Sequence, residues 1–327
     1  MRELTIKQQA KELLEQNMGS YISGEEIALA LGCSRGAVWK AVKQLQNEGY
    51  PISAVTNKGY CLDEKTDRLS KNTIVKLLGE SAEGLDIRVF DTIDSTNNYL
   101  KELASKGESE GAIAISEQQT GGKGRLGRKF YSPAGSGLYI SFLLRPSLAA
   151  AEAAKITTMA AVAVAQAIED SFAVKTDIKW VNDVYINGRK ICGILTEAAF
   201  DLESGGLDYA VCGIGINVYE PEGGFPDEIK DIAGAVLNEK AGGARNQLSA
   251  SLISHFLRLY NSGDPAAFYE DYTKRLIWTG EQINVITPKL TRTATMLGVD
   301  KDCKLHVRYE DGTEEYIASG EISIRRK

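Results

Sequence analysis

A segment rich in glycine and cations, QQTGGKGRLGRKFYSP at residues 118–133, constrains this chain more than any other part of its sequence. Glycines let backbone N–H groups approach a ligand closely, and interleaved cations neutralise phosphate charge. No acidic residue occurs between Gln118 and Tyr131. The segment therefore predicts an anion-binding loop built on Gly121, Gly122, Lys123, Gly124, Arg125, Gly127, Arg128 and Lys129.

The sequence around this loop narrows the kind of site it can form. The G-x-x-x-x-G-K-[ST] spacing of a P-loop is absent, and so is a Rossmann turn with its acidic partner. A disordered RNA-binding tract is the alternative for a segment of this composition. The β-rich runs GAIAISEQQ and LYISFLLRP on either side favour a loop held at both ends by a sheet.

A second group of polar residues lies in KWVNDVYINGRK at residues 179–190. Lys179, Asn182 and Asp183 lie at the end of a predicted strand, and Lys190 begins the next strand after an Asn-Gly turn. Such a combination suits a site that holds a metal-bound nucleotide and neutralises a carboxylate that meets a phosphate. A surface hairpin with solvated charges is the alternative.

A third segment, DSTNNYLKEL, predicts a helix that begins at Ser95 and Thr96. As helix caps these residues need no functional explanation. Exposed hydroxyls and helix N–H groups can also hydrogen-bond a polar ligand.

The first 65 residues predict a winged helix-turn-helix. Ser23 and Glu26 form a capping-box pattern, and Ser34 can cap the following helix. The runs PISAVT and YCL, joined by NKG, predict a two-stranded wing. Residues 33–62 carry a charge of +3 in a chain whose net charge is -6, so contact with DNA phosphates is expected here. The residues predicted to bind DNA are Ser34, Arg35, Gly36, Trp39, Lys40, Lys43 and Lys58; a protein-protein adaptor is the alternative.

The 327 residues, 43% of them hydrophobic, predict a multidomain α+β protein. We expect the winged module at residues 1–65, a central α+β domain on a mixed sheet at 66–275 and a small SH3-like β-barrel at 276–327. Residues 63–72 are polar and predict a linker. The turn DGT at Asp311–Thr313 separates two strands of the last domain.

Several classes of protein are excluded by the same sequence. Charged and polar residues interrupt the longest apolar stretch, near residues 149–167, so we expect no membrane span. The N-terminus lacks the apolar region of a signal peptide, which predicts a cytoplasmic protein. Five scattered cysteines and two histidines predict buried small side chains rather than disulfides or a permanent metal site.

Five motifs together resemble those of a known family. DSTN at residues 94–97, GGKGRLGRKF, KWVND, RKICGIL and GIGIN at residues 213–217 look like the successive motifs of biotin protein ligases. With the winged module, nearly the whole chain resembles the bifunctional form, which is both ligase and biotin operon repressor.

The resemblance implies an ATP-dependent, AMP-forming ligase. Biotin and ATP, with Mg²⁺, would give biotinyl-5'-AMP, and biotin would pass to a lysine of the biotin carboxyl carrier domain of acetyl-CoA carboxylase or pyruvate carboxylase. The same adenylate would be the corepressor of a homodimer that binds operator DNA of biotin synthesis and transport genes. No membrane partner is implied.

The resemblance also implies roles for individual residues. Those expected to bind biotin are Ser95, Thr96, Asn97, Gln119, Lys123, Gly124, Arg125 and Lys190. Those expected to bind the nucleotide are Arg125, Arg128, Asn182, Asp183 and Asn217, with Mg²⁺ arriving with ATP near Asn182 and Asp183. Arg125, Asp183 and Lys190 are the expected catalytic residues.

The chain departs from the family pattern at two positions. Lys123 stands where many relatives have arginine, which keeps the charge but not the bidentate geometry, and Val181 replaces a usual proline. Three other functions fit parts of the pattern: a lipoate ligase, a metabolite-sensing repressor without ligase activity, and an active ligase whose N-terminal module no longer binds DNA.

Overall fold

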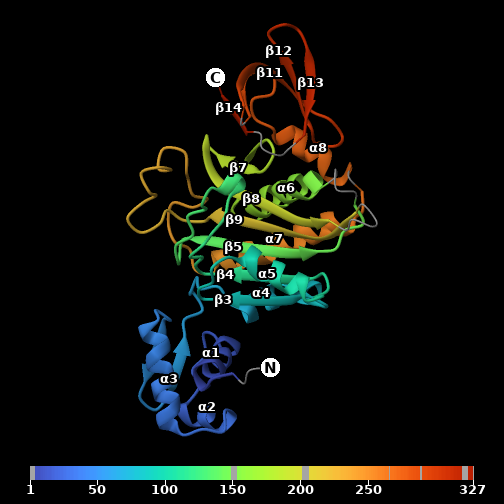
Figure 1. The fold of residues 1–327 in the computed structure, drawn as a ribbon. Helices are drawn as coiled ribbons and strands as arrows, with labels where there is room; N and C mark the ends of the chain where they lie inside the picture. Colours follow the sequence, from blue (N-terminus) through green and yellow to red (C-terminus); the bar gives the residue numbers. More distant parts are fainter. Residues whose placement is uncertain are drawn as a thin grey trace. The chain divides into compact units, whose positions relative to one another are not determined.

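The computed structural model describes residues 4–148, 153–200, 206–264, 266–287, 289–318 and 323–326. The chain divides into two compact units (Figure 1). One comprises Met1–Gly79 with Lys240–Gln247, and the other comprises Glu80–Glu239 with Leu248–Lys327.

The first unit contains the predicted winged helix-turn-helix. Its elements are α1 (Ile6–Gln16), α2 (Gly24–Ala30), α3 (Arg35–Asn47), β1 (Ile52–Val55), β2 (Gly59–Leu62) and α4 (Lys71–Leu78). The capping box of Ser23 and Glu26 is present, and the Ser34 hydroxyl accepts a hydrogen bond from the Ala37 N–H. Strands β1 and β2 pair in antiparallel register as the wing. Leu14, Ile27, Val38, Val42 and Leu45 are buried in one core.

The predicted linker does not lie free within this unit. The guanidinium Nε of Arg245, which is 2% exposed, donates to the Asp67 carboxylate at 2.9 Å, and Leu69 is buried. Asp67 and Arg245 are 178 positions apart, so no local sequence pattern could have indicated this contact.

The second unit is built on a seven-stranded sheet with the order β3-β4-β5-β9-β8-β7-β6. Its strands are β3 (Asp86–Phe90), β4 (Ala112–Ser116), β5 (Gly137–Leu144), β6 (Asp177–Lys179), β7 (Asp183–Ile186), β8 (Arg189–Phe200) and β9 (Leu207–Asn217). Strands β3 and β4 are parallel and the other neighbours antiparallel, which confirms the mixed sheet. The run DIKWVNDVYI forms two strands, β6 and β7, with a turn at Trp180–Asn182.

The register gives this sheet two different faces. Ser141 of β5, Gly213 of β9 and Leu195 of β8 pair in one row and therefore share a face. Helix α5 (Thr96–Ser105) lies on that face, where the side chain of Asn97 contacts Ser141.

The opposite face is covered by α6 (Ala153–Phe172) and α7 (Ala244–Asn261) (Figure 1). Phe142 stacks on Phe256 of α7 with ring centroids 4.2 Å apart. The hydroxyls of Thr157 on α6 and Thr196 on β8 lie 2.8 Å apart. Because α6 and α7 cover this face, the loops that follow β4 and β6 lie on the α5 side of the sheet.

The chain ends in α8 (Ala266–Arg275) and an antiparallel sheet with the order β13-β12-β11-β10-β14. Its strands are β10 (Gln282–Ile286), β11 (Thr291–Val299), β12 (Leu305–Tyr309), β13 (Glu314–Ile317) and β14 (Ser323–Arg326). The small β domain is confirmed. Within the described residues its edge strands β13 and β14 do not pair with each other, so barrel closure is not observed there.

The core of this last domain includes two residues of the central domain. Trp180 and Val181 pack among its buried side chains, and the indole N–H of Trp180 donates to the Cys303 carbonyl at 2.9 Å. The turn between β6 and β7 is thereby fixed from the C-terminal side.

The apolar segments and the cysteines lie inside the fold of the described residues. No helix in the described ranges has the length and apolar character needed to span a membrane. Four cysteines are buried and Cys33 is half-buried, in agreement with their predicted packing role.

Candidate active site

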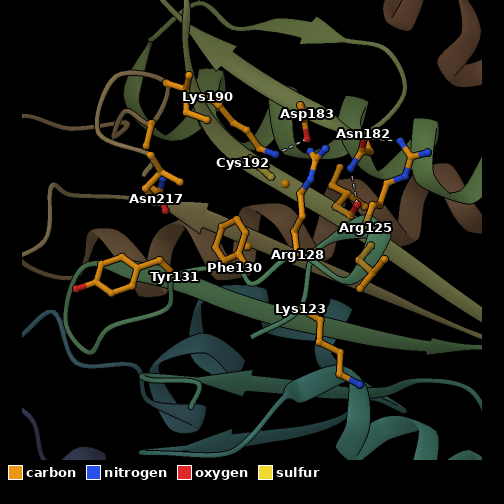
Figure 2. A pocket seen from close by; sticks show the side chains of 18 of the residues that line it. Lys123, Arg125, Arg128, Phe130, Tyr131, Asn182, Asp183, Lys190, Cys192 and Asn217 are labelled. Carbon is orange, nitrogen blue, oxygen red and sulfur yellow. Dashed lines mark hydrogen bonds and ion pairs between the residues drawn. The ribbon is translucent and has the colours of Figure 1, made fainter. Parts of the chain in front are cut away.

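A pocket of about 660 Å³ lies on the α5 side of the central sheet (Figure 2). Gly193, Gly213 and Gly215, from the paired strands β8 and β9, form its floor. Residues of all three predicted motifs line it, together with Trp278 and Arg325 from the C-terminal domain.

Glycines on the floor leave space for neighbouring side chains. A Cβ atom at Gly215 would lie 2.5 Å from the Phe130 ring, and one at Gly213 would lie 2.0 Å from Asn97 Oδ1. Phe130 also contacts the edge of Tyr139 with ring centroids 6.4 Å apart. These two glycines explain physically why the GIGIN motif alternates glycine with isoleucine.

The glycine-rich loop is held between β4 and β5, as predicted, and it folds back on itself. The Gly124 N–H donates to the Arg128 carbonyl at 2.7 Å, and the Phe130 N–H donates to the Gly122 carbonyl at 3.0 Å. A short 3-10 turn, η2 (Arg125–Gly127), forms the tip, where Leu126 has a φ of +58°. The loop thus presents its cations beside the strands.

Charged groups meet at one end of the pocket (Figure 2). Lys190 Nζ lies 2.6 Å from Asp183 Oδ1, and Arg125 Nη1 donates to Asn182 Oδ1 at 3.1 Å. Arg128 belongs to the same group of charges, because its charge acts on both Arg125 and Lys179 and lowers their pKa values. Seven cations and three acids line the pocket: Lys123, Arg125, Arg128, Lys129, Lys179, Lys190 and Arg325, with Asp183, Glu228 and Asp231.

Burial shifts the pKa values of several side chains at this charged end. It lowers the pKa of Arg125, partly offset by the charge of Asp183. Burial likewise lowers the pKa of Lys179, whose ammonium lies 5.3 Å from the centre of the Trp278 ring. Desolvation also raises the pKa of Tyr185 to about 12. Concentrated, partly desolvated cations of this kind favour a polyanionic ligand.

The other end of the pocket, at the start of α5, is lined by hydrogen-bonding groups that are uncharged apart from Lys123. Ser95 caps α5, and Gln119 Oε1 accepts the Thr96 N–H at 2.9 Å and lies 3.1 Å from Thr96 Oγ1. The Gln119 amide N–H donates to the Ser132 hydroxyl at 3.3 Å. Hydrogen-bonding groups on a rigid helix start can orient a neutral polar ligand.

Three predicted site residues are turned toward the protein. The Lys123 ammonium donates to Asn98 Oδ1 at 2.6 Å and lies apart from Lys190 and Asp183 (Figure 2). Asn97 bonds to protein groups beneath the pocket, and Asn217 Nδ2 donates to the Gly234 carbonyl at 3.0 Å. All three still line the cavity.

Sequence reasoning missed several lining residues. Phe130 lines the pocket with its ring against Gly193 and Gly215, so its position depends on the glycine alternation in β9, a signal that the sequence does contain. Trp278 and Arg325 belong to another domain, and no local pattern indicates that they reach this site.

Protein ligands for a metal ion are few in this pocket. The described residues contain no group of three or more histidine, cysteine, aspartate or glutamate side chains able to hold a metal. Asp183 Oδ1 is buried and has the Lys190 ion pair but no hydrogen bond. One carboxylate fits a Mg²⁺ ion that brings its remaining oxygen ligands from phosphates and water.

The winged module carries its predicted DNA-binding residues on the surface. Ser34, Arg35, Gly36, Lys40, Lys43 and Lys58 are all exposed. Trp39 is 55% exposed, so it belongs to the outer face of α3 rather than to the core. An exposed aromatic and basic face on the second helix of the motif fits DNA recognition.

Comparison with known proteins places this chain in a family. The Bacillus subtilis bifunctional ligase/repressor BirA is 36% identical over 332 residues, which cover 98% of this chain and 99% of that protein. The chain belongs to the family of bifunctional biotin protein ligases. The Escherichia coli protein of the same description is 31% identical over 94% of both chains.

Family models match each part of this ligase family member. An HTH domain model matches residues 7–61, the biotin/lipoate A/B protein ligase family model matches 89–217, and the biotin protein ligase C-terminal domain model matches 279–325. The biotin protein ligase of Aquifex aeolicus, solved with biotin and ATP, shares 26% identity at a TM-score of 0.61. That alignment covers 74% of this chain and 99% of the other.

Proposed function

We propose that this protein forms biotinyl-5'-AMP from biotin and ATP, transfers biotin to a lysine of a carboxyl carrier domain, and represses transcription. One observation carries the ligase proposal. A single pocket has uncharged hydrogen-bonding groups at Thr96 and Gln119 and a cationic end at Arg125, Arg128 and Lys190. A neutral ring system bearing a carboxylate, followed by a triphosphate, matches that order of groups.

In the first step, a biotin carboxylate oxygen attacks the α-phosphorus of ATP. A new P–O bond forms, the bond to the β-phosphate oxygen breaks, and pyrophosphate leaves. Lys190 and Arg125 counter the negative charge that develops between carboxylate and phosphate. Asp183 holds the Lys190 ammonium in place at 2.6 Å before the ligand arrives.

In the second step, the amine of an acceptor lysine attacks the acyl carbon of the adenylate. A C–N bond forms, the C–O bond to AMP breaks, and the amine gives up a proton. Asp183 is our candidate to orient or accept a proton from that amine, because it is the acidic residue that lies among the catalytic cations. Carrier domains of acetyl-CoA carboxylase or pyruvate carboxylase are the acceptors.

Mg²⁺ would bind with ATP beside Asp183 and Asn182. When bound, it supplies further neutralisation of the phosphates. Asn182 is 9% exposed and holds Arg125, so its main role is to position that guanidinium.

Repression uses the same adenylate as corepressor. A loop that becomes ordered over the adenylate can change a nearby dimer surface, and a dimer binds a palindromic operator better than a monomer. Accumulated adenylate then reports that acceptor domains are exhausted. Equal operator binding with and without biotin and ATP would contradict this regulation.

ATP-pyrophosphate exchange tests the ligase without an acceptor. We expect exchange with biotin and Mg²⁺, and none with lipoate or without an added acid. If lipoate supported exchange and biotin did not, the substrate of the ligase would be lipoate. Failure to exchange with either acid, in folded protein that binds biotin, would favour a repressor without ligase activity.

A further inference from the structure

Helix α3, whose whole length is described, exposes one large apolar side chain, that of Trp39, which is 55% exposed. The buried face of the helix is complete without it and consists of Val38, Ala41, Val42 and Leu45. The other exposed residues of α3 are Arg35, Gly36, Lys40, Lys43, Gln44 and Asn47. Packing within the winged module therefore does not account for an indole at this position.

The neighbours of Trp39 on the helix surface leave its ring accessible. Residues three and four positions apart lie side by side on a helix, so Trp39 is flanked by Arg35, Gly36 and Lys43. Gly36 has no side chain, and a Cβ atom there would lie 3.8 Å from the Ser34 hydroxyl oxygen. A partner can therefore approach the backbone closely on the N-terminal side of the ring.

Cations surround Trp39 and remain available for phosphates. Glu48, the one acidic residue between positions 33 and 62, pairs with Lys7 of α1 at 2.7 Å. It does not neutralise the exposed cations of α3, which are Arg35, Lys40 and Lys43. Phosphate contacts made by these cations would fix the depth and register of the helix on a duplex. Trp39, between them, would then face the edges of the bases.

The chemistry of those base edges decides what an indole can recognise there. In the major groove each base pair presents hydrogen-bond donors and acceptors, and the C5-methyl of thymine is the one apolar group. The indole ring is apolar except for its single N–H donor. Burial of its apolar surface in the groove is therefore most favourable against a thymine methyl.

We propose that Trp39 recognises a thymine in each operator half-site by packing its indole ring on the C5-methyl group. The inference rests on the proposed repression and deepens it, because it names a base that the operator must contain. Arg35 and Lys43 contact phosphates, which are the same in every sequence. Trp39 is thus the specificity-determining residue of this helix.

The experiment removes one methyl group at a time from the operator. Promoter fragments of biotin synthesis and transport genes from the same genome are tested by mobility shift with full-length protein, biotin and ATP. Footprinting of a retarded fragment locates the operator. Each thymine is then replaced singly by uracil, which lacks the methyl group and keeps the same hydrogen-bonding groups.

Operator affinity is compared for wild type, Trp39→Ala, Trp39→Phe and Leu29→Ala. Leu29 is the matched control, because it is an apolar residue on α2 of the same module and is 84% exposed. Trp39 is itself exposed, so its replacement should not unfold the module. Low salt strengthens the phosphate contacts and keeps weakened complexes measurable.

We expect uracil at one thymine of each half-site to weaken binding of wild type by about fourfold, the effect of one buried methyl group. At that position W39A should lose less than about 1.5-fold, because the partner of the methyl group is absent. The aromatic ring of W39F should restore most of the loss. L29A should respond as wild type does.

Equal responses of wild type and W39A at every thymine would overturn the inference, and so would an operator in which no thymine methyl matters to wild type. Unchanged affinity of W39A for the unmodified operator would also overturn it and would assign the exposed indole to a protein contact. In each of these cases wild type still binds the operator, so the proposed repression stands. If wild type retards none of the promoter fragments, both proposals are wrong.

Discussion

Lys190 is held in the pocket before any ligand binds, by an ion pair with Asp183 at 2.6 Å. Lys190→Ala removes a cation from the position where carboxylate and phosphate meet and leaves Asp183 without that partner. We expect biotin-dependent exchange to fall by about 100-fold or more, because groups that stabilise developing charge commonly contribute this much.

Lys274→Ala is the matched control for this prediction. Lys274 is an exposed lysine that also has an acidic partner, Glu270 at 2.7 Å. Its loss should leave exchange within about twofold, since surface ion pairs contribute little. Similar rates for K190A and K274A would remove Lys190 from the catalytic residues.

Gly215 tests the packing of the pocket floor. In Gly215→Ala the new Cβ would lie 2.5 Å from the Phe130 ring, so the ring must move into the pocket. We expect a loss of about 1–3 kcal/mol in stability and weaker biotin binding, measured by denaturant unfolding and calorimetry. In a Phe130→Ala background the same change should cost much less, and an unchanged cost would show that the ring is not the cause.

How far the candidate site follows from sequence depends on where its residues lie in the chain. The loop, KWVND and the start of α5 each predicted ligand contact from local chemistry, and they line one pocket. Arg325 and Trp278 could not be predicted, because their proximity arises from packing between domains. Lys123 shows another limit, since its position in the loop does not reveal that its ammonium turns to Asn98.

At the scale of elements, α6 and α8 are joined by a network centred on Glu169. Arg275 of α8 pairs with its carboxylate at 2.5 Å, and the Thr176 N–H donates to the same oxygen at 3.0 Å. Burial raises the pKa of Glu169, but these partners outweigh it and lower the pKa below its ordinary value of 4.5. The stabilisation is therefore complete above the unfolded pKa and is lost as pH falls through the folded one.

Glu169→Gln should remove this pH-dependent stabilisation. We expect its melting temperature to be roughly 2–4 °C below that of wild type at pH 7, and the two curves to converge as pH falls below about 4.5. Calorimetric scans between pH 3 and 8 measure this, with exposed Glu310→Gln as the control. A constant difference between wild type and E169Q at all pH values would contradict the assignment.

Elements with strong local patterns were predictable, and those that depend on partners were not. Caps at Ser23 and Ser34 and the alternation along β8 and β9 are local signals. Helix α8 has only a weak local signal, because its buried side chains, such as those of Phe268 and Tyr272, are few and lie among charged residues. The break between β6 and β7 depends on Trp180, which packs in the C-terminal domain's core.

At the scale of the whole molecule, the winged module and the ligase pocket belong to different compact units. A mutation in one unit should therefore impair DNA binding or adenylate formation without impairing the other. K190A impairs adenylate formation without altering the exposed basic face of α3. Removal of cations from α3 should weaken DNA binding without impairing adenylate formation.

The double variant Arg35→Ala/Lys40→Ala tests that reverse case. Both side chains are exposed on α3, and phosphate contacts made by such cations release counterions from DNA. We expect operator affinity, measured by mobility shift with biotin and ATP present, to fall about tenfold or more. The slope of the logarithm of affinity against the logarithm of salt concentration should become smaller by about two. Biotin-dependent exchange should stay within about twofold of wild type. Because adenylate still forms in this variant, lost operator binding with normal exchange would locate the defect in DNA contact; unchanged operator binding would move the DNA interface away from α3.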